Sequence, residues 1–168
     1  MATCPMKRSA LFTFSLGLLV AAVPLLSHAW WNDEWTTRTK VTLNTTAGGV
    51  ETKEAVGGLV VPVRLHSGNF DFAAAKEDGA DLRVIAADDK TPLPFSVERY
   101  DGINELAVLW VAVPAVMPGS DKNLLHVYAG NAKAAVEPGA NVFGPGYMLV
   151  SHFAGEGGPA VDVGGALR

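Results

Sequence analysis

Short runs in which apolar and polar residues alternate follow one another along most of this chain, and clusters of Gly, Pro, Asn and Asp separate them. Alternation with a period of two places apolar side chains on one face of an extended strand, whereas helices repeat every 3.6 residues. The pattern predicts strands at residues 37–43, 59–65, 81–86, 93–99, 105–113 and 123–128, and a further strand-like run at 147–153.

The connections between these runs are short, which restricts how the strands can pair. Pairing neighbours in succession by hairpins gives antiparallel sheets, because a parallel crossover needs a longer connection. Pro62 has no amide donor and therefore indicates an edge or a bulge in the second run. Residues 70–76 have helical propensity, and Asp78-Gly79 would end that helix. We therefore expect an all-β fold, an antiparallel β-sandwich of the jelly-roll or immunoglobulin-like type with one short helix.

The N-terminus has the pattern of a secretory signal. A short basic region precedes an apolar run without charge, residues 9–26, which is followed by Ser27-His28-Ala29. Signal peptidase requires small side chains one and three residues before the cut, and this tripeptide provides them. We expect residues 1–29 to be a signal peptide and the mature chain to start at Trp30. An uncleaved membrane anchor is the alternative.

Composition narrows the function further. The single cysteine, Cys4, lies in the predicted signal, so the mature chain would have no disulfide, thiolate nucleophile or cysteine metal site. The signal also carries two of the 13 basic residues and none of the 17 acidic ones, which leaves 11 against 17 and a formal net charge of −6. Such an acidic chain without a basic run is a poor partner for nucleic acid or an anionic membrane. We expect an exported protein of the periplasm or cell surface, with membrane contact only through sequence beyond Arg168.

Several short motifs occur in a characteristic order. They are Trp31 and Trp35, Phe70-Asp71-Phe72, Asp78-Gly79-Ala80-Asp81-Leu82-Arg83, Leu93-Pro94-Phe95, Leu109-Trp110-Val111 with Pro114, and Tyr128-Ala129-Gly130-Asn131-Ala132. Together they resemble an uncharacterised bacterial exported domain, a domain of unknown function. That domain is found N-terminal to concanavalin-like or laminin-G-like domains and, in some proteins, to channel segments of the MotA/TolQ/ExbB type. The resemblance implies an envelope protein, but no activity or site to carry over.

The C-terminal part of the chain is richer in Gly and Pro than the part before it. Gly and Pro cluster between the last predicted strand of the sandwich and residue 147, and Phe153-Ala154-Gly155-Glu156-Gly157-Gly158 looks like the opening of a laminin-G-type domain. We therefore expect a β-sandwich domain at 30–133, a linker at 134–146 and the start of a truncated laminin-G-like domain at 147–168. An ordinary terminal strand with a frayed tail is the alternative.

No motif for catalysis or metal binding stands out. The three histidines of the predicted mature chain are far apart in sequence, at His66, His126 and His152. No serine lies in a Gly-x-Ser-x-Gly sequence. Asp78 with Asp81, and Asp88 with Asp89, are paired carboxylates, which glycosidases use across a cleft, but turn aspartates usually bond nearby backbone amides. We expect no catalytic residue, no metal site and no cofactor. The same carboxylate oxygens leave Ca²⁺ binding as an open alternative, although their spacing lacks the EF-hand pattern.

Trp110 lies on the same face of its predicted strand as Leu106, Val108 and Ala112. Large aromatic side chains among aliphatic ones most often pack in a core. We therefore expect Trp110 to be buried between the sheets.

The remaining aromatic residues are the candidates for binding. Trp31 and Trp35 either form an exposed platform that stacks on sugar rings or fold back to cover a sheet edge, which we favour. Tyr100 and Asp101, in the turn before the fifth strand, are further candidates for ligand contacts. 

These observations favour a non-enzymatic exported module of a larger envelope protein that binds a glycan, a polymer or a protein partner. A periplasmic spacer or sensor part of a MotA/TolQ/ExbB-type proton channel protein is the second hypothesis. A hydrolase of surface polymers is the third.

Overall fold

The computed structural model describes residues 30–137, 142–144, 146–147 and 149–152. Within these residues all regular secondary structure is strand and no helix occurs. No segment of this part of the chain forms an apolar helix of the length that crossing a bilayer requires. The predicted signal peptide, and most of the predicted laminin-G-like start, lie outside the described residues.

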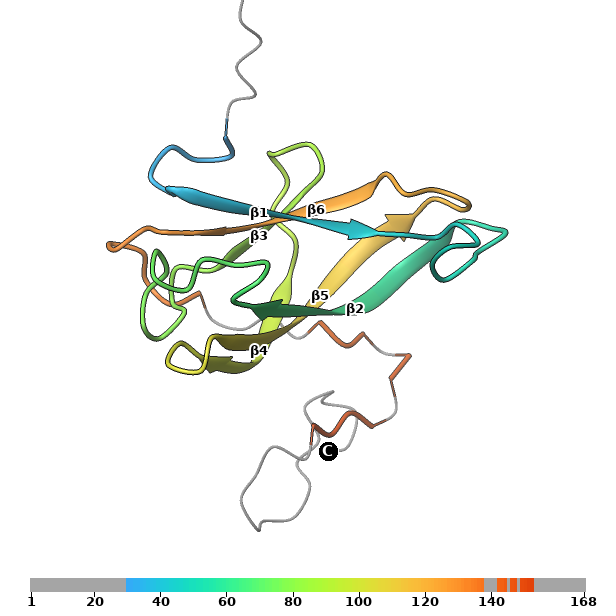
Figure 1. The fold of residues 1–168 in the computed structure, drawn as a ribbon. Helices are drawn as coiled ribbons and strands as arrows, with labels where there is room; N and C mark the ends of the chain where they lie inside the picture. Colours follow the sequence, from blue (N-terminus) through green and yellow to red (C-terminus); the bar gives the residue numbers. More distant parts are fainter. Residues whose placement is uncertain (1–29, 138–141, 145, 148, 153–168) are drawn as a thin grey trace, which may run out of the picture.

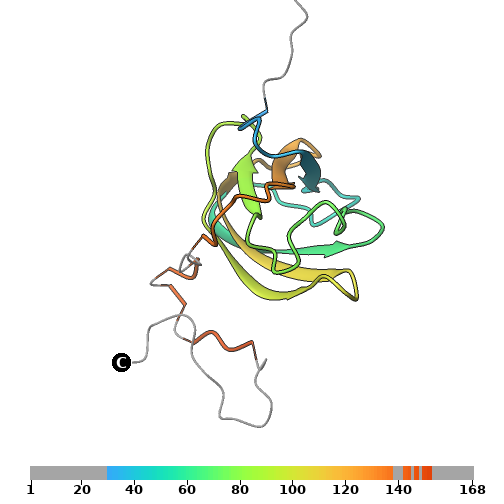
Figure 2. The same cartoon turned by 90° about the vertical axis from the view of Figure 1, so that its left-hand side faces the viewer.

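Six strands form two antiparallel sheets of three strands each, stacked as two layers (Figures 1 and 2). The first sheet has the order β1-β6-β3 and the second β2-β5-β4. The strands are β1 Thr37–Leu43, β2 Val56–His66, β3 Arg83–Ala86, β4 Phe95–Asp101, β5 Leu106–Val116 and β6 Asn123–Ala129. The predicted all-β sandwich is confirmed, and all six strands fall within the predicted domain at 30–133.

The core lies between the two sheets. It is built from the apolar side chains that point inward at every second position of the strands. In β5, every second residue from Ala107 to Val113 is buried, and in β6, Leu125, Val127 and Ala129 face the same interior. Among the described residues, fifteen buried apolar side chains form this cluster. At roughly 1.5 to 3 kcal/mol for each fully buried large aliphatic side chain, the cluster supplies the main driving force for folding.

The predicted pairing of successive strands is wrong, because only β4 and β5 are joined as a hairpin of neighbours. β6 lies between β1 and β3, and β5 lies between β2 and β4. Strands that follow one another in sequence mostly lie in different sheets. Apart from the β4–β5 turn, each loop therefore crosses from one sheet to the other. Pro62 does lie on an edge strand, as expected, because β2 pairs only with β5.

The predicted short helix at residues 70–76 is also wrong, since this segment consists of turns. The Asp71 carboxylate accepts hydrogen bonds from the amides of Ala73 and Ala74, as a helix N-cap would. The amide of Lys76, however, donates to Asp81 Oδ1 at 3.1 Å rather than to a carbonyl one turn earlier. The side chain of Asp81 therefore ends the helical turn before it can propagate.

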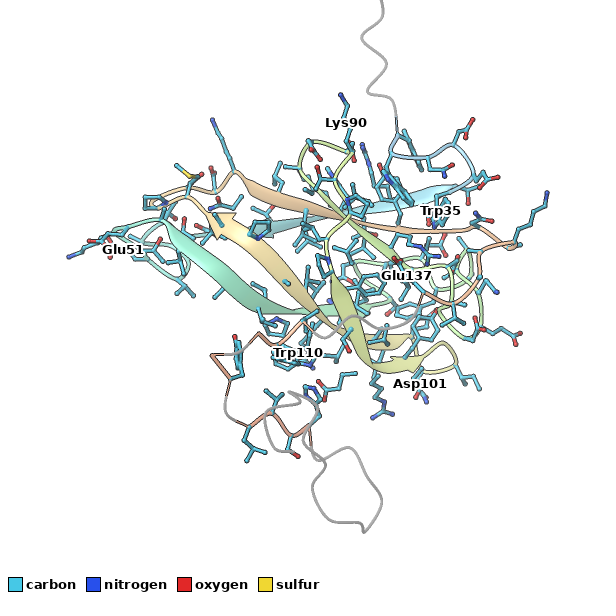
Figure 3. The ribbon with its side chains drawn as sticks, turned by 180° about the vertical axis from the view of Figure 1, so that it is seen from behind. Trp35, Glu51, Lys90, Asp101, Trp110 and Glu137 are labelled. Atoms are coloured by element: carbon cyan, nitrogen blue, oxygen red, sulfur yellow. The ribbon has the colours of Figure 1, made fainter. Side chains whose placement is uncertain are left out.

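Trp110 does not lie in the core between the sheets, which corrects a third expectation. The inward positions of β5 are Ala107, Leu109, Val111 and Val113, so Trp110 projects from the opposite, outer face and is half-buried there. Figure 3 shows Trp110 and Trp35 on opposite sides of the molecule.

The C-terminal residues that are described pack beneath the second sheet. Val142 and Phe143, which fall in the predicted linker, are buried, and Phe143 contacts Trp110 with ring centroids 5.7 Å apart. Of the predicted strand at 147–153, the described residues are not in strand conformation.

Candidate functional site

The N-terminal tryptophans fold back onto the first sheet. Trp35 is 7% exposed, and its Nε1 donates to the main-chain oxygen of Asp81 at 2.7 Å. The Trp31 ring packs against Trp35 with centroids 4.9 Å apart and against Tyr128 at 5.9 Å. These two residues cover the outer face of the sheet, so the exposed-platform alternative is wrong for Trp35.

A buried polar network lies beneath this aromatic cover. The Tyr128 hydroxyl donates to Asp89 Oδ1 at 2.8 Å, and Arg38 Nη1 donates to Asp89 Oδ2 at 2.6 Å. Trp31 joins the network through its amide, which donates to the Tyr128 hydroxyl at 3.2 Å. Asp89 is 8% exposed, whereas the side chain of its countercharge, Arg38, is 26% exposed, so the ion pair links the buried network to the surface.

His126 borders the same network. Its Nδ1 lies 3.0 Å from Asp89 Oδ1 but without hydrogen-bond alignment. Burial lowers the pKa of His126 below its ordinary value of 6.5, which outweighs the opposing effect of Asp89, and the positive charge of Arg38 lowers it further. The neutral imidazole is therefore the form that suits the folded protein.

Tyr100 and Asp101 lie at the end of β4, in the second sheet, and Asp101 is labelled there in Figure 3. The Tyr100 ring packs against Phe72 with centroids 5.8 Å apart, and its hydroxyl donates to the Lys76 carbonyl at 3.1 Å. Burial raises the pKa of Tyr100, and the negative charges of Asp81 and Asp78 raise it further. The phenol thus stays protonated and acts as a hydrogen-bond donor.

The Tyr100 ring also lies directly against Gly79. A Cβ atom at Gly79, which has a φ of 66°, would come 2.7 Å from Tyr100 Cδ2, so no larger residue fits under the ring.

Hydrogen bonds from Asn104 hold the Asp101 side chain in place. It accepts hydrogen bonds from the Asn104 amide at 3.0 Å and the Asn104 side chain at 2.9 Å, and these bonds lower the pKa of its carboxyl group.

A groove of about 800 Å³ opens beside Tyr100 and Asp101. Its walls come from the loop after β2 and from the β4–β5 hairpin. They comprise Phe72, Ala73, Ala75, Glu77, Arg99, Tyr100, Asp101, Gly102 and Ile103. We call this the Tyr100 groove. It contains two of the four candidate binding residues, whereas Trp31 and Trp35 lie on the other sheet.

The four turn aspartates are all engaged in hydrogen bonds. Asp78 accepts from the Ala80 amide, and Asp88 accepts from the side chain and amide of Thr91. The hydroxyl of Thr91, and then its amide, lower the pKa of Asp88 from 3.8 to about 2. These are the local turn contacts that the sequence indicated.

Asp81 has a larger structural role. It is fully buried, and its two carboxylate oxygens accept three backbone amides. Oδ1 accepts from Lys76, and Oδ2 accepts from Gly130 at 2.6 Å and Asn131 at 3.2 Å. One side chain thus joins the loop before β3 to the loop after β6.

Sequence reasoning missed a cluster on the outer face of the second sheet. Trp110 Nε1 donates to Glu98 Oε2 at 2.6 Å, and His152 stacks on the Trp110 ring with centroids 5.3 Å apart. His152 Nδ1 also lies 3.4 Å from Glu98 Oε2. The segment around Phe143 and His152 therefore covers Trp110, and nothing in the local sequence of β5 indicated this distant partner.

The described residues contain no cluster of metal-binding side chains. Among the described residues, no three His, Cys, Asp or Glu side chains gather closely enough to hold a metal ion. The three histidines of the described residues lie in different surroundings. His66 Nδ1 accepts the Gly68 amide at 3.1 Å, His126 adjoins Asp89, and His152 stacks on Trp110.

Comparison with known protein families gives a match to part of the chain. Residues 78–155 match the family model described as Domain of unknown function (DUF2341). The matched region begins just before β3 and extends past β6 to include the residues that cover Trp110. No curated protein matches the chain, and no solved structure does.

Proposed function

We propose that this chain is an exported, non-enzymatic binding module of a larger cell-envelope protein, and that it recognises a polymeric ligand through the Tyr100 groove. The observation that carries the proposal is the groove itself. Its volume of about 800 Å³ falls in the range of ligand sites, roughly 300 to 1,000 Å³.

The lining has the character of a recognition surface. Phe72 and Tyr100 provide aromatic area, and Arg99, Asp101 and Glu77 place charged groups around it. Ile103, in the hairpin turn, is 95% exposed and adds apolar area beside the groove that a bound ligand would cover. Because Tyr100 is fixed by Gly79 and by its hydrogen bond to Lys76, little side-chain entropy would be lost on binding.

The absence of enzymatic activity is part of the proposal. Two of the four carboxylates from the sequence analysis, Asp81 and Asp89, are buried and bonded to backbone amides or to buried partners, and Asp78 and Asp88 accept local turn amides. A general acid or base needs a free, approachable oxygen or nitrogen at the reacting atoms. Export rests on the N-terminal signal pattern alone.

The proposal is tested by screening the secreted chain against an array of glycans, envelope polymers and envelope proteins. Tyr100→Ala and Ile103→Ser should each weaken the binding of any ligand found, by about tenfold for Tyr100, since truncating a central aromatic contact costs roughly 1 to 2 kcal/mol. Tyr100→Phe keeps the ring and should bind nearly normally.

Val50→Ser is the matched control, because Val50 is 77% exposed and lies beside Glu51 at the far end of the molecule (Figure 3). It should leave binding unchanged. The proposal fails if the array yields no ligand, which favours a spacer role, or if Tyr100→Ala and Ile103→Ser bind as the control does. Release of shortened polymer from a bound ligand would indicate a hydrolase instead.

A further inference from the structure

A second groove, of about 390 Å³, lies on the outer face of the β2-β5-β4 sheet. It is lined by Arg64, Leu65, His66, Arg99, Leu106, Ala107 and Val108. We call it the arginine groove. Strand register explains its composition, because Arg64 of β2 and Arg99 of β4 both pair with Val108 of the central strand. The two arginines therefore flank Val108, with Cα atoms roughly 10 Å apart across two strand spacings.

The charge on this groove is largely uncompensated. Arg64 is exposed and forms no ion pair with any described residue. Arg99 has a single ion pair among the described residues, with Asp101 at 3.2 Å, and its side chain is 66% exposed. No acidic side chain of the described part of the chain lines the groove. A positive site on a chain with a formal net charge of −4 indicates selection of an anionic ligand.

The floor of the groove is apolar rather than polar. Leu106 is 45% exposed and Val108 is partly exposed beside it, so the floor offers aliphatic surface between the charged rims. His66 adds a donor, because its Nδ1 accepts the Gly68 amide and the neutral ring must then carry its proton on Nε2. A suitable ligand thus has an apolar face and a carboxylate on the same unit.

The arginine groove adjoins the Tyr100 groove, since Arg99 lines both. A ligand that runs along the end of the β4–β5 hairpin would contact the two grooves in succession. This geometry suits a chain of repeating units better than a small isolated anion.

We propose that the arginine groove binds the carboxylates of an acidic polysaccharide, that is, a polymer whose sugar rings bear carboxyl groups. The C–H face of a ring would lie on Leu106 and Val108, and its carboxylate would accept paired hydrogen bonds from Arg64 or Arg99. The proposal rests on the proposed binding function and specifies the ligand for it. Charge complementarity and the aliphatic floor are the arguments for this occupant.

The test measures binding of the secreted chain to polygalacturonate, to the same polymer with its carboxyl groups reduced to alcohols, and to poly-glutamate, at 20 and at about 300 mM salt. Polygalacturonate should bind, the reduced polymer should bind at least about tenfold more weakly, and high salt should weaken binding because exposed charges are screened. Arg64→Gln and Arg99→Gln should each weaken binding about fivefold.

Lys53→Gln is the matched control, since it removes one exposed positive charge from the loop between β1 and β2. It should change binding less than twofold. Equal weakening by Lys53→Gln and Arg64→Gln would mean that only net charge matters, and the site would be refuted. Equal or tighter binding of poly-glutamate would replace the polysaccharide with an acidic protein segment.

The outcomes separate this inference from the proposed function. Binding of neutral polymers that depends on Tyr100 but not on Arg64 would refute the arginine groove and keep the binding module. Failure of every polymer and protein to bind would refute both. Thermal melting of each variant tests whether loss of binding arises from unfolding. The melting temperatures of Arg64→Gln and Arg99→Gln should equal that of the unsubstituted chain, because both side chains are exposed.

Discussion

Replacing Asp81 by Asn tests whether one buried carboxylate holds the two loops together. The carboxylate has two acceptor oxygens, and both are used: Lys76 donates to one, and Gly130 and Asn131 donate to the other. An asparagine side chain has a single acceptor oxygen, and an NH₂ group in place of the second. Whichever way the amide turns, at least one backbone donor meets another donor.

The magnitude follows from that mismatch. The favourable rotamer directs the Asn oxygen to Gly130 and Asn131, which leaves the Lys76 amide without an acceptor and adds a buried NH₂ group without a partner. Each buried donor that loses its partner costs about 1 to 3 kcal/mol, so Asp81→Asn should lower the free energy of unfolding by about 2 to 4 kcal/mol. That is a large share of the roughly 5 to 15 kcal/mol typical of a domain.

Urea denaturation followed by tryptophan fluorescence measures the loss, with an unchanged slope showing that the same surface unfolds. Asp78→Asn is the matched control in the same loop. Asp78 is exposed and accepts one amide, from Ala80 at 3.0 Å, which an Asn oxygen can accept equally well, so its cost should stay below about 0.5 kcal/mol. If Asp81→Asn is as mild as Asp78→Asn, the carboxylate does not join the loops and the reasoning fails.

Three further predictions follow from burial, from the pKa of His126 and from the signal pattern. Trp35→Ala should destabilise by about 3 to 5 kcal/mol and Trp110→Ala by about 1 to 2, because only Trp35 is fully covered, and the reverse order in urea melts would contradict the structure. Because folding lowers the pKa of His126, the unfolded state binds more protons once the pH falls below about 6.5, so stability should decline from pH 7.5 to 5.5. This decline should be smaller in His126→Gln; an unchanged decline in that variant would assign the pH dependence to other groups. N-terminal sequencing of the secreted chain should begin at Trp30, and retention of residues 9–26 would contradict export by cleavage.

The positions of the strands could be predicted because they depend on local pattern. The strand at Thr37–Leu43 was predicted with its observed bounds, since threonine and valine alternate with charged residues between clear breaks. The inner face of β5 could not be assigned in this way. Leu106, Val108 and Trp110 are as apolar as Ala107 and Leu109, so alternation gives two equivalent choices, and only packing against the other sheet selects one.

The candidate site depended even more on distant contacts. Asp81 and Asp89 resemble ordinary turn aspartates in sequence, yet one accepts amides from residues about fifty positions away and the other pairs with Arg38. Strand order brings these groups together, and a single sequence carries little information on strand order when loops are short and similar. Tyr100 was identified as a candidate, but its groove also needs the loop around Phe72, which lies beside it only in the folded chain.

The two outer faces of the sandwich differ in how completely the chain covers them. Trp31 and Trp35 pack on the outer face of the first sheet against Ile85 and Tyr128, and Phe143 packs against Trp110 on the outer face of the second. The part of the second sheet near the β4–β5 hairpin keeps exposed side chains, including Leu106. Burial of Leu106 and Val108 would gain free energy, and nothing else in the described chain provides it. The two grooves there are therefore the surfaces on which a search for a ligand should begin.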